Sequence, residues 1–519
     1  MSSPRVRFAP SPTGPLHMGG VRTALYNYLF ARKHQGKFIL RIEDTDQQRF
    51  VPGAEDYIIE ALKWCGISPD EGVGFGDGPY APYRQSDRKA LYHQYAEQLI
   101  AGGHAYYAFD AAADLEAQRK SMEASGSAFS YNAASRMSMQ NSLSLTAEEV
   151  KERMASGAAY VVRLKIPSGE TVQLHDLVRG DVVVSTDQLD DKVLFKSDGM
   201  PTYHLANVVD DYLMKITHVI RGEEWLPSAP LHVLLYRYLG WEDVMPKFAH
   251  LPLLLKPDGN GKLSKRDGDR LGFPVFPLNW TDPFSGEVSS GYRERGYYPD
   301  SFLNIIALLG WHPSDDKEIV SLDEMIQEFS LEKVSKSGAK FDPEKTKWIH
   351  EQYFRKQPDE VLAASLKSLL SQRFGFAATD KRMADAFLIK AVELLKLRVQ
   401  FENELIDKGI YLFEAPDTYD EAVLTKKWKP EFAIIFAELA LAFSNSSAFN
   451  ATAAEEIFKS IAAQHNRKPG ELLQLLRVLI SGQAGGVDLF PMIELLGQQE
   501  VADRMNKALS RISSMTIPS

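Results

Sequence analysis

The sequence contains a single cysteine, Cys65, among 519 residues. One thiol excludes an internal disulfide and any zinc site built from several cysteines. The chain also lacks an apolar run long enough to span a bilayer, and its first residues contain no apolar signal core. We therefore expect a cytoplasmic protein with no membrane segment.

An excess of positive charge is also missing, because the formal net charge is −10. Residues 331–519 hold 25 basic and 25 acidic side chains, so the negative balance lies entirely in the first 330 residues. A basic domain is the usual electrostatic footprint of a nucleic-acid-binding protein. Any RNA contact must therefore come from local basic patches rather than from bulk charge.

The first forty residues have the pattern of a strand–helix–strand unit. Residues 5–9 predict a short strand, and residues 37–42 predict an apolar strand typical of a buried parallel sheet. Residues 21–33 between them predict a helix with one apolar face. This order predicts an α/β fold with a Rossmann-type parallel sheet that binds a nucleotide.

Residues 86–202 interrupt this pattern, and strand and helix signals of the first type resume at 203–221. Within the interruption, Thr146 and Glu149 have the spacing of a capping box that opens a helix. Two segments rich in β-branched residues, 161–166 and 181–186, predict strands. The segment therefore reads as an α+β insertion in the sheet domain.

Beyond about residue 300 almost every pattern is helical. Ser321 with Glu324, and Thr452 with Glu455, have the spacing of capping boxes and predict two helix starts. Residues 273–291 are instead rich in Pro, Gly, Ser and aromatic side chains. We call them the aromatic excursion, and the sequence assigns them no role.

The N-terminal turn, residues 9–20, joins the first predicted strand to the first predicted helix. Backbone N–H groups and the helix dipole favour phosphate at such a point. Gly14, Gly19 and Gly20 allow a ligand to approach the backbone closely, and His17 can donate a hydrogen bond to a phosphate oxygen. Taken alone, a simple turn with a surface histidine explains the segment equally well.

The lysine loop, residues 259–268, places Lys262, Lys265 and Arg266 between glycines. A mobile cationic loop can close on a triphosphate and offset the charge that develops during phosphoryl transfer. It is not a Walker A loop, because the required glycine spacing is missing. Taken alone, a solvated charge cluster is the better explanation.

Together the two segments resemble the paired signatures of class I aminoacyl-tRNA synthetases, His-x-Gly and Lys-x-Ser-Lys. Further segments are similar to the glutamyl-tRNA synthetase family over nearly the whole chain. These segments are 7–14, 41–46, 83–88, 203–207, 220–225, 307–311, 341–345 and, more weakly, 476–482 with 490–497. The resemblance implies ATP-dependent ligation of L-glutamate to the 3′ end of tRNA-Glu through a glutamyl-adenylate, with release of AMP and pyrophosphate.

The resemblance also implies a role for each region. Residues 1–85 and 203–256 would form the two halves of the catalytic domain, and 86–202 a connective insertion that binds the acceptor end. Residues 257–360 would form a stem-contact region that contains the lysine loop. Residues 361–519 would form an all-α anticodon-binding domain.

For the amino-acid substrate, the resemblance implies a pocket of fixed charges. Arg7 would bind the side-chain carboxylate of glutamate, Arg221 one of its two carboxylates, and Glu43 its ammonium group. Supporting contacts are assigned to Ala9, Ser11, Tyr203 and Asn207. Glutamine would leave a buried guanidinium without its counterion, at a cost of roughly 3–5 kcal/mol. A purely structural ion pair is the alternative for each charged residue.

Catalysis is assigned to groups that hold ATP rather than to a covalent nucleophile. His17, Gly19, Lys262 and Lys265 would act on the transferring phosphate. The ATP-binding set is His17, Gly19, Gly20, Glu224, Lys262, Ser264 and Lys265. Mg²⁺ would accompany ATP, held largely by phosphate oxygens.

The sequence departs from the family pattern at three points. Gly20 stands where the common His-x-Gly-His signature ends in histidine, and Arg266 replaces the final serine of the second signature. Some relatives bind zinc in the insertion through several cysteines. Residues 105–110 contain none, so we expect no zinc.

RNA contacts are expected in two places. Gln85, Ser86 and Arg88 would lie near the acceptor end of the tRNA or the rim of the pocket. Arg398 and Arg477 would lie among the C-terminal helices, where unstacked bases can stack on aromatic or arginine faces. A solvated or structural role is an equal alternative for each arginine. A monomer is expected, with tRNA-Glu as the partner and tRNA-Gln as a second candidate.

Several other functions remain open at this point. A glutaminyl-tRNA synthetase shares the catalytic ancestry, but the helical C-terminal part and the Pro-rich N-terminal turn argue against it. A shorter tRNA-modifying relative or a small nucleotidylyltransferase would lack the helical part. A catalytically inactive RNA-binding or scaffold protein would not need the intact charged residues of the pocket and loops.

Overall fold

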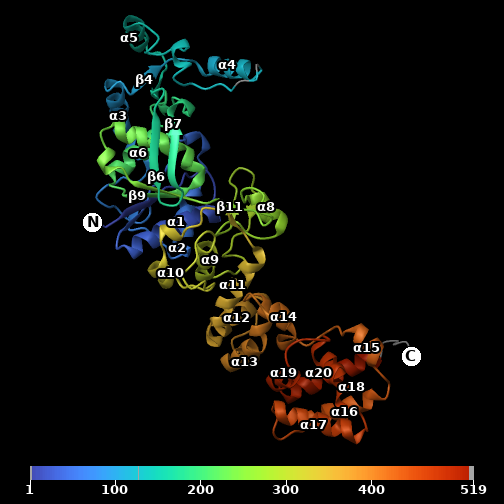
Figure 1. Ribbon diagram of the computed structural model, residues 1–519. Helices are drawn as coiled ribbons and strands as arrows, with labels where there is room; N and C mark the ends of the chain where they lie inside the picture. Colours follow the sequence, from blue (N-terminus) through green and yellow to red (C-terminus); the bar gives the residue numbers. More distant parts are fainter. Residues whose placement is uncertain (1–2, 125, 127, 514–519) are drawn as a thin grey trace. The chain divides into compact units, whose positions relative to one another are not determined.

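The computed structural model describes residues 3–124, 126 and 128–513, except for the side chains of Lys265 and Asp269. The chain forms two compact units, residues 1–349 and residues 350–519 (Figure 1). Each unit is described by itself below.

The first half of the catalytic sheet is parallel, as the N-terminal pattern predicts. Its strands are β1 (Arg5–Phe8), β2 (Lys37–Leu40) and β3 (Glu71–Gly72), in the order β1-β2-β3, and its helices are α1 (Met18–Lys33) and α2 (Ala54–Trp64). Helix α1 begins at Met18, three residues before the predicted start, because the side chain of His17 caps it.

The second half of the sheet has the order β7-β6-β10-β9. Its elements are β6 (Thr171–Asp176), β7 (Gly180–Ser185), α6 (Tyr203–Leu213), β9 (His218–Gly222), α7 (Ala229–Tyr238) and β10 (Lys247–Leu251). Strands β6, β10 and β9 are parallel, and β7 is antiparallel to β6. The backbone N–H of Thr217, just before β9, donates to the carbonyl of Arg5 in β1. The two half-sheets therefore adjoin at β1 and β9.

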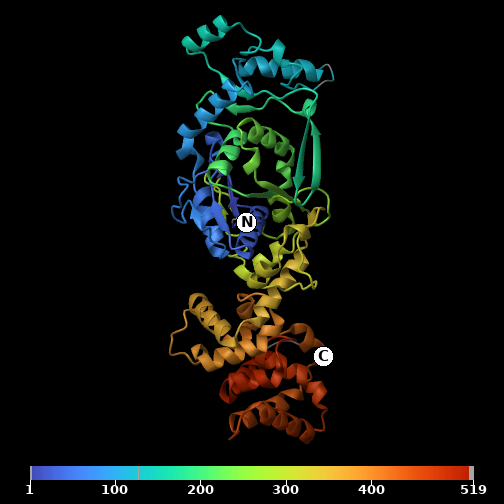
Figure 2. The same cartoon turned by 60° about the vertical axis from the view of Figure 1, so that its left-hand side comes forward.

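The insertion contains a small antiparallel sheet in the order β4-β5-β8. Its elements are α3 (Lys89–Ala101), β4 (Ala105–Ala108), α4 (Ala112–Ala124), α5 (Ala147–Ala155), β5 (Val161–Leu164) and β8 (Val193–Phe195). The predicted capping box is confirmed, because Thr146 and Glu149 bond reciprocally at the start of α5. The two long teal strands in Figure 2, β6 and β7, run from this small sheet back to the catalytic sheet.

The last part of the first unit carries the lysine loop and the aromatic excursion. Its elements are β11 (Leu254–Leu255), α8 (Lys265–Leu271), β12 (Trp280–Thr281), β13 (Val288–Ser289), α9 (Pro299–Ala307), α10 (Leu322–Glu328), β14 (Ala339–Lys340) and the start of α11 (Pro343–Lys356). The predicted capping box of Ser321 and Glu324 opens α10. The excursion forms the β12–β13 hairpin and is anchored by Tyr57, whose hydroxyl donates to the carbonyl of Leu278.

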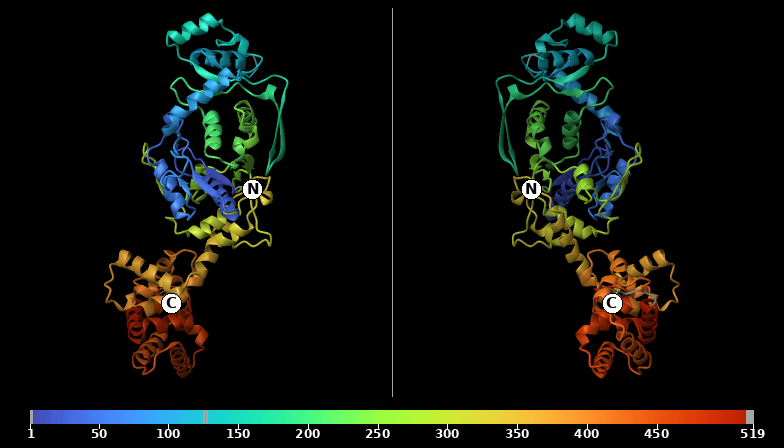
Figure 3. Two further views of the ribbon diagram at one scale, coloured as in Figure 1. Left: turned by 90° about the vertical axis from the view of Figure 1, so that its left-hand side faces the viewer. Right: turned by 90° about the vertical axis from the view of Figure 1, so that its right-hand side faces the viewer.

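Helices make up the second unit, in the orange-to-red part of Figure 3. They are α12 (Asp359–Phe374), α13 (Asp385–Leu395), α14 (Glu404–Phe413), α15 (Glu421–Lys427), α16 (Phe432–Ser444), α17 (Ala451–Gln464), α18 (Pro469–Ser481), α19 (Leu489–Leu496) and α20 (Gln498–Ser513). The predicted cap at Thr452 is wrong. Helix α17 begins at Ala451, two residues earlier than predicted, and Asn450 caps it by accepting from the N–H of Ala453. Across the described residues of the chain, no helix is both long and apolar enough to cross a bilayer.

Candidate active site

A cavity of about 600 Å³ lies at the carboxyl ends of β1, β2, β9 and β10. Open α/β sheets bind ligands at such a point, where the strand order reverses. The cavity brings together twelve of the residues singled out in the sequence. They are Arg7, Ala9, Ser11, His17, Gly19, Gly20, Glu43, Tyr203, Asn207, Arg221, Glu224 and Lys262.

A buried ion cluster forms the floor of this cavity. Arg7 donates to both carboxylate oxygens of Asp211, from Nε at 2.9 Å and from Nη2 at 3.2 Å. Arg41 donates to the same carboxylate at 2.7 Å and to Glu43 at 2.8 Å. Burial raises the pKa of Asp211, but the two arginines outweigh it and hold this pKa below its usual value. Asp211 therefore stays ionised and offsets charge that Arg7 would otherwise present.

Glu43 is oriented by two donors on the same oxygen. Its Oε1 accepts from Arg41 at 2.8 Å and from the amide of Asn207 at 3.1 Å. The other oxygen, Oε2, has no protein donor among the described residues. The side chain is therefore held in place with one oxygen left for a cation such as an ammonium group.

Arg221, like Arg22 in the same cavity, is a guanidinium with no acidic partner among the described residues. It donates to the hydroxyl of Tyr203 at 2.6 Å, to Nε2 of His250 at 3.0 Å and to the carbonyl of Trp225 at 3.3 Å. Within the described part of the chain, no carboxylate lies within salt-bridge distance of it. Burial raises the pKa of Tyr203 to about 12, so the tyrosine accepts as a neutral hydroxyl.

The pocket therefore carries an unbalanced positive charge. Besides Arg22, which lines the cavity and donates to two backbone carbonyls, Arg7, Arg41 and Arg221 supply three guanidinium groups, and Glu43 and Asp211 supply two carboxylates. All five side chains are at least nine-tenths buried. Because a buried charge is costly without a counterion, the cavity favours a ligand whose own net charge is negative.

His17 presents a hydrogen-bond donor to this cavity. Its Nδ1 accepts from the backbone N–H of Gly19 at 3.1 Å, so the proton of the neutral ring resides on Nε2. Burial and then the charge of Lys262 lower the pKa of His17 to about 4. Nε2 is buried and has no partner among the described residues. A neutral ring with a free N–H beside a helix N-terminus fits a phosphate oxygen.

The aromatic excursion supports the N-terminal turn. The carbonyl of Val275 accepts from the backbone N–H of Met18 at 2.8 Å, and Phe276 lies edge-on to the ring of His17 at 6.0 Å. A Cβ at Gly20 would lie 2.5 Å from Leu16 Cδ1, so a larger residue there would require the Leu16 side chain to shift.

The lysine loop reaches the cavity through Lys262. Its ammonium lies 3.3 Å from Glu224 and is largely exposed, so the pair is readily exchanged for a ligand. Ser264 does not line the cavity as the structure describes it. Instead, it is the N-cap of α8, and the Asp267 carboxylate accepts from its hydroxyl at 2.5 Å and from its backbone N–H at 3.1 Å. The side chain of Lys265 lies outside the described residues, and its role stays a prediction.

Two of the residues expected near the tRNA acceptor end are held inside the domain. Gln85 donates to Asp210 at 2.9 Å and Arg88 donates to it at 2.7 Å, and both side chains are buried. Arg88 also donates to two backbone carbonyls. These contacts give both residues a structural task, because a buried charge such as Asp210 needs partners. Of the three, only Ser86 is half-exposed.

Arg398 and Arg477 lie close together in the second unit, although 78 residues separate them. Arg398 donates to Asp488 at 3.4 Å, and Arg477 donates to the carbonyl of the preceding residue, Val487, at 2.6 Å. Burial, together with the nearby charge of Arg398, lowers the pKa of Arg477. The two guanidinium groups therefore form one basic spot on this unit.

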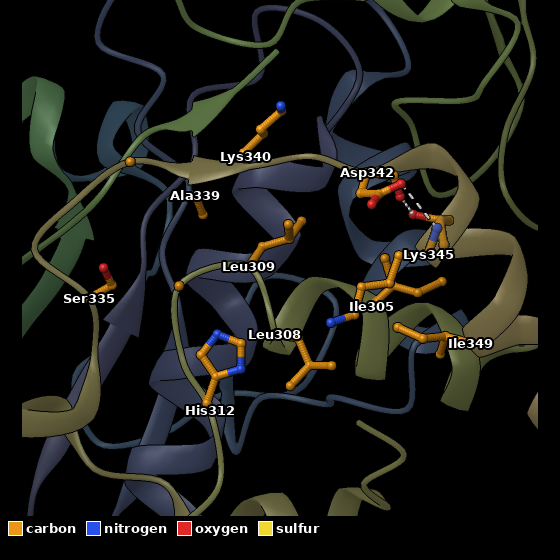
Figure 4. A pocket seen from close by; sticks show the side chains of 13 residues that line it. Ile305, Leu308, Leu309, His312, Ser335, Ala339, Lys340, Asp342, Lys345 and Ile349 are labelled. Atoms are coloured by element: carbon orange, nitrogen blue, oxygen red, sulfur yellow. Dashed lines mark hydrogen bonds between the residues drawn. The ribbon is translucent and has the colours of Figure 1, made fainter. Parts of the chain in front are cut away.

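A second cavity of about 300 Å³ lies between α9, β14 and α11 (Figure 4). Apolar side chains such as Ile305 and Leu309 form its floor, and Lys340 and Lys345 lie at its edge. It contains none of the predicted site residues. Where the structure describes the side chains, no group of three or more His, Cys, Asp or Glu is arranged to hold a metal ion.

Comparison with known proteins agrees with this geometry. Residues 4–348 match the family model for the catalytic domain of class I tRNA synthetases (E and Q), and residues 361–509 match an anticodon binding domain. The glutamate–tRNA ligase of Cytophaga hutchinsonii is 53% identical over 516 residues, which cover 98% of each chain. That of Porphyromonas gingivalis is 53% identical over 506 residues, which cover 97% of this chain and 98% of its own. The chain belongs to the glutamate–tRNA ligase family.

Solved structures of this family have the same fold. The glutamate–tRNA ligase of Elizabethkingia meningosepticum, crystallised with its amino acid, is 49% identical and superposes with a TM-score of 0.94, covering 98% of this chain and 99% of its own. The enzyme of Elizabethkingia anophelis has a TM-score of 0.92 at 49% identity and covers 98% of this chain and 100% of its own. The predicted fold class and family are therefore confirmed.

Sequence reasoning missed three residues behind the pocket: Asp176, Asp211 and His250. Asp211 had a signal, since Asp210 and Asp211 stand side by side after two valines in a helix with an apolar face. Two adjacent acids on a buried helix require buried cations. Asp176 and His250 gave no such signal, because they meet only through the pairing of β6 with β10.

Proposed function

We propose that this chain activates L-glutamate with ATP and transfers it to the 3′ end of tRNA-Glu. In the first step, an oxygen of the glutamate α-carboxylate attacks the α-phosphorus of ATP, and pyrophosphate leaves. In the second step, a hydroxyl of the terminal ribose attacks the acyl carbon. AMP leaves, and the hydroxyl proton is released to solvent.

The inference that glutamate is the amino-acid substrate rests on one observation, the unbalanced positive charge of the pocket. Glutamate has two carboxylates and one ammonium, so its charge of minus one complements the pocket. Glutamine is neutral overall and keeps only its α-carboxylate, so it would leave one buried guanidinium charge of the pocket unbalanced. We assign Arg221 and the free Nη1 edge of Arg7 to the carboxylates, and Oε2 of Glu43 to the ammonium. Ser11 and the backbone of Ala9 complete the contacts.

The phosphate groups of ATP fit the donors on the opposite side of the cavity. His17 Nε2 would donate to a phosphate oxygen, and the N–H groups at Gly19 and Gly20 would bind beside it. Lys262 and Lys265 would close on the triphosphate as charge develops in the transition state. Mg²⁺ would accompany ATP on phosphate oxygens.

For the tRNA, Ser86 near the pocket and the spot formed by Arg398 and Arg477 are the proposed contacts. Unstacked bases can stack on arginine side chains. The spot contains only two arginines, which agrees with a domain that has no excess of basic residues. We propose a cytoplasmic monomer, and the insertion and the helical unit would bind the acceptor end and the anticodon respectively.

The test is aminoacylation by the purified chain with radiolabelled glutamate or glutamine and either tRNA-Glu or tRNA-Gln. We expect ATP-dependent charging of tRNA-Glu with glutamate. Parallel charging of tRNA-Gln with glutamate decides whether that tRNA is a second substrate. Charging with glutamine in preference to glutamate, or no charging with any tRNA, would overturn the proposal.

A further inference from the structure

Three side chains stand in a row behind the pocket, on three neighbouring parallel strands. Asp176 ends β6, His250 lies in β10 and Arg221 lies in β9. Asp176 Oδ2 lies 2.6 Å from His250 Nδ1, and His250 Nε2 lies 3.0 Å from Arg221 Nε. Their exposed fractions are 1%, 0% and 5%. The row therefore links a carboxylate of the insertion to the substrate-facing arginine, away from solvent.

The contacts fix the proton on the imidazole ring. A guanidinium has only donors, so His250 Nε2 must accept from Arg221. The ring proton is then on Nδ1 and is donated to Asp176. The other oxygen of Asp176 accepts from the backbone N–H groups of Val178, Arg179 and His250, so the carboxylate cannot turn away. Burial also lowers the pKa of His250, which keeps the ring neutral.

This row acts on Arg221, a guanidinium of the pocket with no acidic partner among the described residues. Arg221 is otherwise held by neutral groups: the Tyr203 hydroxyl, the Trp225 carbonyl and, at 3.5 Å, Nδ1 of His232. A bidentate contact with a carboxylate depends on the plane of the guanidinium. The hydrogen bond from Nε sets this plane and leaves the Nη groups toward the cavity.

We propose that Asp176 and His250 are positioning residues for glutamate: Asp176 selects the imidazole tautomer, and the imidazole in turn orients Arg221 toward a substrate carboxylate. The inference rests on the proposed function, since it concerns the same pocket. It assigns the β6–β7 hairpin a task in amino-acid binding as well as in folding.

Asp176→Asn tests the tautomer. The amide oxygen can still accept the three backbone N–H groups, so its NH2 group faces His250 Nδ1. That nitrogen must then accept, and the proton moves to Nε2, where it opposes the N–H of Arg221. A reversed tautomer of this kind impairs a histidine even when the geometry is retained.

His250→Gln and His250→Asn form a matched pair. A glutamine amide reaches the position of Nε2 and can accept from Arg221. An asparagine amide reaches only the position of Nδ1 and keeps the contact with Asp176 alone. A purely structural role would make the two variants alike, whereas the proposed role makes glutamine the better replacement.

A second His–Asp pair on the same hairpin supplies the control. His175 Nδ1 and Asp181 Oδ1 also lie 2.6 Å apart, but both side chains are exposed, at 68% and 84%. His175→Gln and Asp181→Asn therefore change the same chemistry outside the pocket. The full chain of each variant is assayed for aminoacylation of tRNA-Glu, and KM is measured separately for glutamate and for ATP.

We expect Asp176→Asn and His250→Asn to raise KM for glutamate roughly 10- to 100-fold, the effect of leaving one buried donor unpaired. His250→Gln should raise it clearly less, and KM for ATP should stay unchanged in all variants. If Asp176→Asn does not fold, the His250 pair decides. Equal KM values for that pair, or KM for ATP rising in step with KM for glutamate, would overturn the inference. A wild-type chain that charges no glutamate would instead overturn the proposed function.

Discussion

Arg7 and Asp211 form a two-pronged ion pair beneath the substrate cavity, with both carboxylate oxygens engaged. The same carboxylate also accepts from Arg41. One acid thus contacts two buried cations: Arg41 also pairs with Glu43, whereas Asp211 is the only carboxylate paired with Arg7 among the described residues. The pair is part of the fold as well as of the pocket.

Asp211→Asn should therefore destabilise the protein strongly. Removal of one partner of a buried ion pair costs about 3–5 kcal/mol, because the remaining charge stays uncompensated. The midpoint of thermal unfolding of the first unit reports this loss. Asp181→Asn, at an exposed site, is the control and should leave the midpoint unchanged. A wild-type midpoint for Asp211→Asn would mean that the cluster relaxes at little cost.

Arg221→Gln should strongly reduce the preference for glutamate over glutamine. It should have only a small effect on the midpoint of thermal unfolding. The substitution removes one positive charge from a group of three guanidiniums and two carboxylates, while the partners of Arg221 are themselves neutral. We expect kcat/KM for glutamate to fall by about two to four orders of magnitude, as for about 3–5 kcal/mol of lost ion pairing. The measurement is charging with each amino acid in competition.

Arg7→Gln is the comparison for this prediction. It also removes a positive charge from the pocket, but it leaves Asp211 short of a partner, so the unfolding midpoint should fall as well. The assignment of Arg221 would not survive an unaltered preference in Arg221→Gln combined with a large loss of preference in Arg7→Gln.

Lys262→Ala and Lys265→Ala should slow glutamate activation and leave KM for glutamate nearly unchanged. Both lysines are proposed to act on phosphate charge in the transition state, and removal of one such group typically costs about 100- to 1000-fold in rate. Glutamate-dependent ATP–pyrophosphate exchange in the presence of tRNA measures the step. Lys37→Ala, at the opposite end of β2, is the control. A matching loss of glutamate affinity would argue against the role of the lysine loop.

Much of this site could be predicted from sequence because its residues lie in continuous segments with strong local patterns. The N-terminal turn and the segment after β2 that carries Arg41 and Glu43 are such segments, and their positions at strand ends bring them together. Helix starts at Thr146 and Ser321 were predictable for the same reason, since a capping box spans only four residues.

The remaining parts depend on contacts between distant segments. Asp211 pairs with Arg7 across 204 residues, and Asp176 pairs with His250 across 74. Gln85 and Arg88 were expected near the surface, but both are buried and donate hydrogen bonds to Asp210. Helix α17 is capped by Asn450 rather than by Thr452. Both residue types are good N-caps, so the sequence pattern alone does not distinguish between them.

Acidification below neutrality should destabilise the first unit. Burial is the main cause that lowers the pKa of His17, His204 and His218 from 6.5 to about 4 each. Between these values the unfolded chain binds protons that the folded chain does not, so stability decreases as pH falls from 6.5 toward 4. Unfolding midpoints measured at about pH 7 and about pH 5 test this.

His218→Gln provides the control for the pH dependence. The residue lies at the start of β9, outside the substrate cavity, and contacts Thr217. Its replacement removes one titrating group, so the midpoint should depend less steeply on pH than in the wild type. A midpoint that rises on acidification would contradict the assigned direction of these pKa shifts.

The distribution of charge in the pocket also bears on redesign. An enzyme for a neutral amino acid cannot be made from this scaffold by enlarging or reshaping the cavity alone. The guanidinium of Arg221 would remain buried and would still require an anionic ligand. The smallest change that would remove this requirement is to replace Arg221 together with His250 and Asp176, which orient it. The Arg7–Asp211 pair can stay, since it is already neutral as a unit. Substrate preference can therefore be altered at Arg221 while the ion pair of Arg7 and Asp211, which stabilises the fold, is retained.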